Sequence, residues 1–293
     1  MSRTDFPLLV SPSWLAEQMD DPDLRILDAS VHIIRREDGR SDARSGRESY
    51  LAEHIPGAQF VDVLHVLSDR TQKARFAIPA PGDFAAAMEA LGVGEGTKAV
   101  VYSSTGVWWA TRVWWLLRYH GFEPVAVLDG GLQKWKAEGR PVTPEVKEIV
   151  SAKFRPQIDQ SRIAMKQDVL EAISEESSAS VLDVLSPEYF RGELGDIFGY
   201  GRLGHIAGAV NFPTDALMHS DDTFRGEAEI TNRVSELVGK LDRPAITYCG
   251  GGIAATQAAF ALELAGLKGV RVYDGSLEEW AADPSLPMRT GSG

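Results

Sequence analysis

The sequence has a single cysteine among its 293 residues, and it also lacks long apolar runs. One cysteine cannot form a disulfide within the chain, so nothing indicates an oxidising compartment. No apolar run approaches the roughly 20 residues needed to span a bilayer. Residues 1–14 have no apolar core of signal-peptide length. We therefore expect a cytoplasmic protein that does not interact with membranes.

Basic residues are also fewer than acidic ones, so the formal net charge is −12. Such a surface repels nucleic-acid phosphates. The one arginine-rich stretch, residues 35–47, is interleaved with acidic residues, which is typical of a solvated loop. The six histidines have no paired spacing of the kind that a metal site needs. We expect neither a nucleic-acid partner nor a bound metal.

The chain contains the same pattern twice, at a separation of roughly 150 residues. The matching segments are 54–60 with 205–212, 100–103 with 246–249, and 127–135 with 272–280. This period is too long for a solenoid repeat, so it indicates a duplicated domain. We place the two domains at residues 1–145 and 156–293, with a linker in the proline- and charge-bearing stretch 141–160.

Within each copy, short β-rich runs alternate with helical patterns, which predicts an α/β fold with a parallel sheet flanked by helices. The expected strands are residues 24–28, 99–102, 125–128, 180–184, 245–248 and 270–273. The expected helices are residues 12–20, 83–91, 107–120, 232–241, 253–265 and 276–282. The tryptophans at 108, 109, 114 and 115 favour a buried helix face. His54 and His205 occupy equivalent repeat positions, which favours a structural role in each domain.

Cys249 follows the expected strand 245–248 and precedes three glycines and a helix. Ligand sites of parallel sheets lie at such strand ends. Glycines let the backbone N–H groups turn inward, and a helix start adds its positive end. We predict that this loop lowers the thiol pKa and stabilises a thiolate or persulfide. The predicted donors are the backbone amides of Gly250, Gly251, Gly252, Ile253 and Ala254.

Other interpretations of this loop fit less well. A lone cysteine is most often a small buried hydrophobic residue, but a packing role requires no glycine run. A phosphate-binding P-loop ends in Lys-Ser/Thr, whereas Gly252 is followed by Ile253 and Ala254. A cysteine phosphatase needs an arginine six residues after its nucleophile, and position 255 is alanine. The first copy has Ser103 in place of Cys249, so we expect it to be catalytically silent.

These residues resemble the tandem rhodanese family of thiosulfate and 3-mercaptopyruvate sulfurtransferases over nearly the whole chain. The paired His-Ile-x-Gly-Ala segments, residues 112–118, residues 127–132 and the Cys249 loop carry the resemblance. It implies that Cys249 takes a sulfane sulfur from a small-molecule donor, thiosulfate or 3-mercaptopyruvate. A thiophilic acceptor, cyanide or a thiol, then removes it. The resemblance implies no metal or organic cofactor.

The loop itself departs from both branches of that family. Thiosulfate-type members carry Cys-Arg-Lys-Gly and mercaptopyruvate-type members carry Cys-Gly-Ser-Gly, whereas here three glycines follow Cys249. Of the histidine and aspartate that accompany the family's serine, only Asp62 is present, because Phe76 begins the segment expected to start with histidine. The donor therefore stays open. A non-catalytic binding or sulfur-sensing module is the alternative.

An arginine that the resemblance places six residues after the strand-end aspartate falls on Tyr189, with Arg191 close by. Arg202 lies just before the repeated histidine segment. We assign Arg191 and Arg202 as candidate donor-binding residues. Exposed surface arginines are the competing interpretation.

Overall fold

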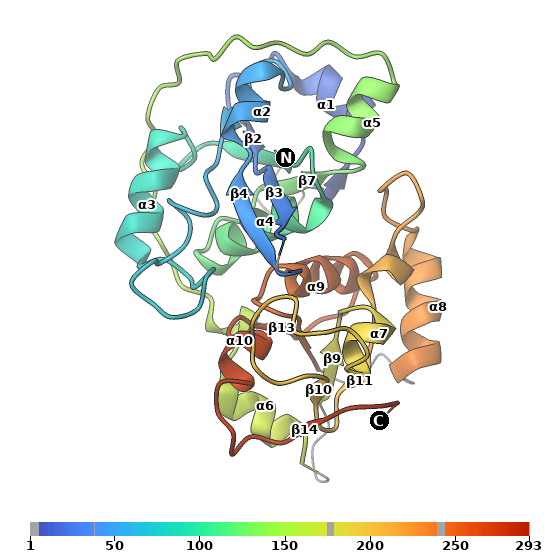
Figure 1. Ribbon diagram of the computed structural model, residues 1–293. Helices are drawn as coiled ribbons and strands as arrows, with labels where there is room; N and C mark the ends of the chain where they lie inside the picture. Colours follow the sequence, from blue (N-terminus) through green and yellow to red (C-terminus); the bar gives the residue numbers. More distant parts are fainter. Residues whose placement is uncertain (1–5, 38, 175–178, 239–243, 293) are drawn as a thin grey trace. The chain divides into compact units, whose positions relative to one another are not determined.

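The structure is a computed structural model that describes residues 6–37, 39–174, 179–238 and 244–292. The chain forms two compact units, each with its own sheet (Figure 1). Unit 1 comprises Met1–His32, Ala43–Asp159 and Ser220–Thr223, and unit 2 comprises Ile33–Asp42, Gln160–His219 and Phe224–Gly293. The limits 1–145 and 156–293 stay a prediction. Within the described residues, no helix combines the length and apolar character needed to cross a membrane.

Unit 1 is built on a five-stranded parallel sheet in the order β1-β7-β6-β2-β5. Its strands are β1 (Leu9–Val10), β2 (Leu24–Asp28), β5 (Gln59–Phe60), β6 (Lys98–Tyr102) and β7 (Val125–Leu128). The central strands β2, β6 and β7 are largely buried, as their continuous apolar runs require of a sheet covered on both faces. A separate two-stranded sheet pairs β3 (Val31–Arg35) with β4 (Ser41–Ser45).

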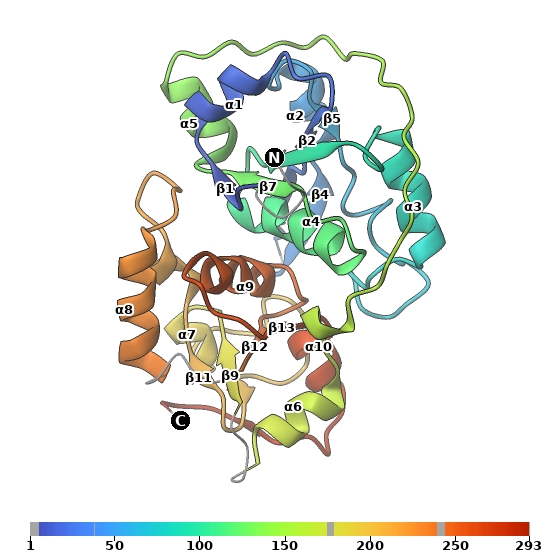
Figure 2. The same ribbon diagram turned by 180° about the vertical axis from the view of Figure 1, so that it is seen from behind.

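The helices of unit 1 flank this sheet (Figure 2). They are α1 (Pro12–Gln18), α2 (Arg47–Ala52), α3 (Pro81–Ala90), α4 (Val107–Tyr119) and α5 (Gly131–Ala137). The Ser11 hydroxyl caps α1 by accepting the N–H of Trp14 at 3.1 Å. In α4, Trp109, Trp114 and Trp115 are buried as predicted. Trp108, which was predicted to be buried with them, is only half-buried, and its ring lies over Gly106 at the start of the helix.

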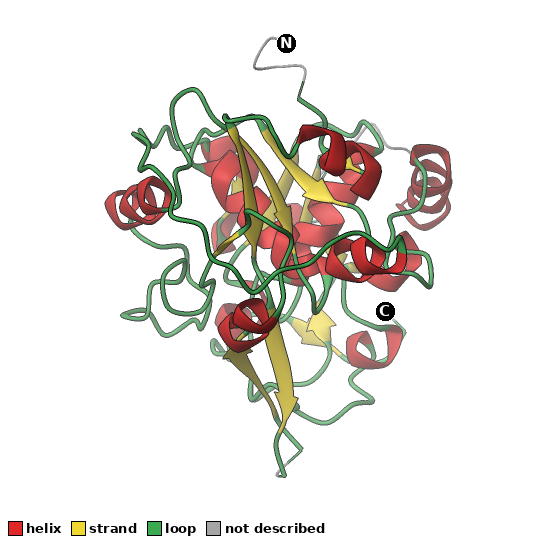
Figure 3. Ribbon diagram, turned by 90° about the horizontal axis from the view of Figure 1, so that it is seen from above, coloured by secondary structure: helices red, strands yellow, loops and turns green. Residues whose placement is uncertain are grey.

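Unit 2 repeats the architecture with the strand order β11-β9-β12-β13-β8, again parallel. Its strands are β8 (Ile163–Ala164), β9 (Ser180–Asp183), β11 (Val210–Asn211), β12 (Ala245–Tyr248) and β13 (Val270–Tyr273), with β10 (His205–Ile206) pairing β14 (Met288–Arg289) apart from them. Its helices are α6 (Lys166–Ala172), α7 (Pro187–Phe190), α8 (Glu227–Val238), α9 (Ala254–Leu264) and α10 (Ser276–Trp280), with short 3-10 turns at Gln160–Arg162 and Thr214–Leu217. Helices surround the strands (Figure 3), which confirms the predicted fold class.

One helix differs from its prediction. The pattern placed a helix at residues 232–241, whereas α8 begins at Glu227, and residues 239–241 lie outside the described residues. Ile230 and Val234, one helical turn apart, are both buried and anchor the apolar face of α8. The helix therefore begins where this face requires it, before the predicted start at residue 232.

The repeated histidines have matching environments. His54 donates from Nδ1 to the carbonyl oxygen of Tyr50 at 2.6 Å and stacks on that ring. His205 donates from Nδ1 to the carbonyl oxygen of Phe190 at 2.8 Å and also stacks on its partner. Both side chains are buried. These contacts support the predicted structural role.

Candidate active site

The candidate site lies where strand β12 is followed by helix α9. The buried strand Ala245–Tyr248 ends at Cys249, which is only 3% exposed. Gly252 has a φ of +80°, and a Cβ there would lie 2.6 Å from the carbonyl oxygen of Asp274. Only glycine adopts this conformation in so little space. The glycine run thus creates a tight turn directly after the cysteine.

Backbone amides of this turn and of the start of α9 converge on the sulfur. The N–H groups of Gly251, Gly252, Ala254 and Ala255 hydrogen bond to the Cys249 sulfur. The first N–H groups of a helix have no partner within it, which leaves those of α9 available.

The observed donors differ in part from the predicted ones. Gly251, Gly252 and Ala254 belonged to the predicted set, and Ala255 was missed. Ala255 could have been identified from its position in the first turn of the helix, where backbone N–H groups have no partner within the helix. For Gly250 and Ile253 the contact with sulfur stays a prediction, as does the stabilisation of a persulfide by this loop.

Burial dominates the ionisation of Cys249. Loss of contact with water raises the pKa of its thiol above the ordinary value, although the surrounding amides act in the opposite direction. The predicted lowering of this pKa is therefore wrong for the resting thiol. The glycines indicate where the amides point, but the depth of the sulfur depends on packing by distant segments.

A serine that the sequence did not single out holds the cysteine backbone. The Ser276 hydroxyl accepts the N–H of Cys249 at 3.1 Å and donates to the carbonyl oxygen of Tyr273 at 2.8 Å. Ser276 is fully buried and has a φ of +48°, which is unusual for a residue other than glycine. The residue at the equivalent position of the first copy is Gly131. This difference between the copies is the sequence feature that could have identified Ser276.

A buried carboxyl and phenol lie beneath the loop. The Tyr248 hydroxyl accepts the N–H of Ile206 at 3.1 Å and hydrogen bonds to the Asp183 carboxyl group. Burial raises the pKa of Asp183 to about 6. Unit 1 has the same arrangement, in which Tyr102 hydrogen bonds to Asp28. Because it also occurs where no cysteine is present, we regard this pair as part of the scaffold.

Both candidate arginines are bonded to other groups of the protein. Arg191 donates from Nε and Nη2 to the two carboxylate oxygens of Glu193, each at 2.7 Å. Arg202 donates from Nη1 to the carbonyl oxygens of Asp283 and Leu286, each at 3.0 Å. A role for these arginines in donor binding stays a prediction. Their observed contacts hold the segment between α7 and β10 in place.

The equivalent loop of unit 1 contains hydroxyls instead of sulfur. Ser103, Thr105, Gly131 and neighbouring residues line a pocket of about 140 Å³ at the end of β6. Ser103 Oγ accepts the N–H of Thr105 at 3.1 Å. This loop therefore has an internal hydrogen-bond network of its own.

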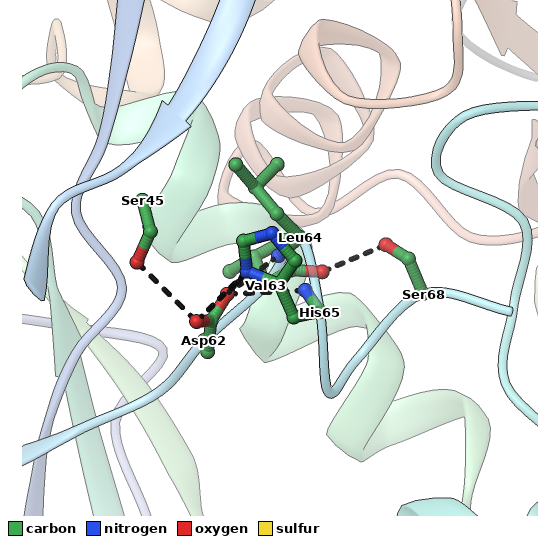
Figure 4. Close-up of polar contacts among 6 residues, drawn as sticks. All are labelled: Ser45, Asp62, Val63, Leu64, His65 and Ser68. Carbon is green, nitrogen blue, oxygen red and sulfur yellow. Dashed lines mark hydrogen bonds and ion pairs between the residues drawn. The ribbon is translucent and has the colours of Figure 1, made fainter. Parts of the chain in front are cut away.

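Asp62 of unit 1 has a histidine partner that sequence reasoning missed (Figure 4). His65 Nδ1 lies 3.0 Å from each Asp62 carboxylate oxygen. The same carboxylate accepts the N–H groups of Leu64 and His65, and the Ser45 hydroxyl at 3.3 Å. The short i,i+3 spacing of Asp62 and His65 was the available signal.

Among the described residues, no cluster of three or more acidic, histidine or cysteine side chains has the arrangement of a metal site.

Fold and site together define a tandem α/β protein with one cysteine loop at the end of a central strand. The family model for the rhodanese-like domain matches residues 11–138 and 166–283. The chain belongs to the rhodanese family.

Two relatives and one solved structure match it over nearly their full length. It is 34% identical to the 3-mercaptopyruvate sulfurtransferase of Escherichia coli (strain K12), over 98% of this chain and 99% of that protein. It is 32% identical to the sulfur carrier protein TtuD of Thermus thermophilus, over 97% of each. The crystal structure of SseA from Escherichia coli, described as a 3-mercaptopyruvate sulfotransferase, superposes with a TM-score of 0.81 at 32% identity, over 92% of this chain and 98% of that one.

Proposed function

We propose that this protein is a sulfurtransferase in which Cys249 carries a sulfane sulfur from a small-molecule donor to a thiophilic acceptor. The donor is of the thiosulfate or 3-mercaptopyruvate type, and the acceptor is cyanide or a thiol. The observation that carries the proposal is the convergence of four backbone amides on the only cysteine of the chain. The names of the relatives point in the same direction.

The proposed reaction has two half-reactions. The Cys249 thiol loses its proton to water, and its sulfur attacks the sulfane sulfur of thiosulfate. The S–S bond of the donor breaks, sulfite leaves with the electron pair, and Cys249 carries a persulfide. Cyanide then attacks the outer sulfur and leaves as thiocyanate, and the electron pair returns to Cys249. A covalent enzyme form between two substrates implies ping-pong kinetics, and neither step needs a metal or an organic cofactor.

The amides supply the electrostatic part of this mechanism. Preorganised N–H groups stabilise an anion in a site that excludes water and do not have to reorient during the reaction. The resting thiol is neutral, because burial raises its pKa. The benefit of the amides is therefore greatest when the sulfur becomes an anion.

The test is the intact mass of the protein after incubation with thiosulfate or 3-mercaptopyruvate. We expect the wild-type protein to gain one sulfur atom and Cys249→Ser to gain none. Ser103→Ala, at the equivalent position of unit 1, is the matched control and should gain sulfur as the wild type does. Equal labelling of wild type and Cys249→Ser would overturn the proposal.

A second candidate is a non-catalytic module that binds or senses sulfur with the same loop. It is favoured by the loop's lack of cationic side chains and by the engagement of Arg191 and Arg202 with other groups. Turnover of cyanide or a thiol with any sulfane donor, well above the rate of Cys249→Ser, would eliminate it.

A further inference from the structure

Three aromatic side chains of unit 2 form a row of rings, which we call the aromatic cluster: Tyr189, Phe198 and Tyr200. The ring centroids of Tyr189 and Phe198 are 5.8 Å apart, and those of Phe198 and Tyr200 are 5.7 Å apart with planes tilted by 28°. Tyr189 is buried in the core, whereas Phe198 and Tyr200 are half-buried and keep part of their surface exposed. Rings in such a row provide a surface on which a further planar ring stacks favourably.

Tyr200 brings the cluster to the cysteine loop. A Cβ added to Gly250 would collide with the Tyr200 hydroxyl oxygen and would lie 2.9 Å from the ring carbon that bears it. The phenol thus occupies the space that a side chain at position 250 would need, one residue after Cys249. The surface beside the proposed nucleophile is therefore aromatic.

Hydrogen bonds within the surrounding segment hold Tyr200 in place. Charged side chains of this segment are already bonded to the backbone or to one another. The Asp196 carboxylate accepts the backbone N–H groups of Tyr200 at 2.7 Å and of Gly201 at 2.8 Å. Arg191 pairs with the Glu193 carboxylate. An anionic group on a ring that stacks on the aromatic cluster would therefore lose water without gaining an ion pair with Arg191, which is bonded to Glu193.

We infer that the aromatic cluster binds the sulfur acceptor, and that this acceptor is an organic thiol whose aromatic ring bears no anionic substituent. This inference rests on the proposed function and adds the class of substrate. Ring stacking favours an aromatic acceptor over a saturated one of similar size.

The transfer step moves one sulfur and needs no oxidant or reductant. The acceptor thiolate attacks the outer sulfur of the protonated Cys249 persulfide. The S–S bond breaks, and its electron pair remains on the Cys249 sulfur. The acceptor leaves as its own persulfide, which carries the proton.

The test uses the full-length protein, loaded with thiosulfate until its intact mass shows one added sulfur atom. Three acceptors with the same CH₂–SH group then discharge it: phenylmethanethiol, cyclohexylmethanethiol and the para-carboxylate of phenylmethanethiol. We expect the second-order rate constant for phenylmethanethiol to exceed that for the cyclohexyl compound by about 2- to 10-fold. We expect it to exceed that for the carboxylate by about tenfold or more.

Variants assign this preference to Tyr200. Tyr200→Leu should abolish the preference for the aromatic ring over the cyclohexyl ring, and Tyr200→Phe should retain it. Tyr119→Leu in unit 1, where Tyr119 stacks on Trp115 at 5.4 Å, is the matched loss of a half-buried tyrosine and should leave the preference unchanged. If Tyr200→Leu fails to fold, the acceptor comparison in the wild type and in Tyr200→Phe decides.

The outcomes separate this inference from the function on which it rests. A protein that gains no sulfur from any donor overturns the proposed function. A protein that loads and then transfers sulfur to all three acceptors at equal rates overturns the acceptor class alone. A preference that persists in Tyr200→Leu would likewise contradict the role of the aromatic cluster.

Discussion

In unit 1 the strand β6 is followed by Ser103, and in unit 2 the strand β12 is followed by Cys249, so equivalent places carry an oxygen and a sulfur. The loop amides find different partners in the two units. In unit 1, Ser103 Oγ accepts the N–H of Thr105, and Ser30 Oγ accepts that of Ser104 at 2.8 Å. In unit 2, the loop amides converge on the cysteine sulfur.

This difference teaches that the cysteine completes the hydrogen bonding of its own loop. The glycines of unit 2 have no hydroxyls with which to satisfy the buried amides, which must find a partner somewhere. The scaffold beneath is shared, because Tyr248 accepts the N–H of Ile206 at 3.1 Å and Tyr102 accepts that of Ile55 at 3.2 Å. The contrast therefore lies in the loops and not in the sheets.

The largest expected effect comes from exchanging the two side chains. In a Ser103→Cys, Cys249→Ser double variant, the sulfur should sit in a loop where the Ser30 hydroxyl already accepts the N–H of Ser104. We expect sulfur transfer to fall on the order of a thousandfold or more, the same loss that we expect for Cys249→Ser alone. Steady-state turnover with thiosulfate and cyanide measures it. Recovery of wild-type turnover in the double variant would show that the scaffold, not the loop, determines reactivity.

Two buried side chains, His120 in unit 1 and Asp183 in unit 2, should contribute to the pH dependence of stability with opposite sign. In unit 1, burial lowers the pKa of His120 to about 4, so its contribution to stability is lost as pH falls from about 6.5 to about 4. In unit 2, burial raises the pKa of Asp183 to about 6, so its contribution is lost as pH rises from about 4 to about 6. Each effect is about 3 kcal/mol.

Urea unfolding of wild type, His120→Asn and Asp183→Asn at several pH values measures these two effects. His120→Asn should weaken the loss of stability on falling pH, and Asp183→Asn should weaken the loss on rising pH, while His205 and Asp28, whose pKa values are shifted in the same directions, contribute the remainder. If both variants run parallel to the wild type, neither side chain controls the pH response.

A third prediction concerns whether burial or the backbone amides have the larger effect on the pKa of Cys249. Because burial raises the pKa of Cys249, the thiolate fraction should increase about tenfold per pH unit through neutrality. Alkylation by iodoacetamide, followed by intact mass, should therefore accelerate about a hundredfold from pH 6 to pH 8. The free amino acid cysteine is the control. A rate that is already constant at pH 7 would mean that the amides outweigh burial.

The tight turn at Gly252 can be tested by substitution of the glycine. Gly252→Ala should cost about 2–3 kcal/mol of unfolding free energy and slow sulfur loading, because it combines a positive φ with a clash against Asp274. Gly57→Ala in unit 1 has a similar φ of +84° with nothing within 4 Å of the added Cβ, so it measures the backbone cost alone. Equal destabilisation by the two substitutions would exclude the clash as a contributor.

Much of the fold was predictable because its signals are local. The alternation of apolar runs and helical patterns located the central strands, and the glycine run after Cys249 indicated the turn. The missed features depend on contacts between distant segments. Tyr200 reaches Gly250 across a long loop, and the raised pKa of Cys249 reflects how deeply other segments bury it. Residues 33–42 and 220–223 each group with the unit of the other half, which no local pattern indicates.

The smallest expected effect concerns the backbone of Cys249 and its partner Ser276. Ser276→Ala keeps the φ of +48° and removes the oxygen that accepts the cysteine N–H, so we expect a loss of about 1–2 kcal/mol. Ser276→Gly removes the same oxygen but relieves the backbone, and these two effects of about 1 kcal/mol each should nearly cancel. Unit 1 has Gly131 at this place, with a φ of +51°, so glycine is compatible with the turn.

The two substitutions therefore separate stability from positioning. If Ser276 positions the cysteine, both variants should load sulfur several-fold more slowly, although only Ser276→Ala is clearly destabilised in urea. Ser276→Thr, which keeps the hydroxyl, should recover part of the loading rate. If loading instead followed stability, so that Ser276→Gly loaded as fast as the wild type, the hydroxyl would only stabilise the fold. The functional difference between the two units would then depend only on the Cys249 sulfur and the backbone amides around it.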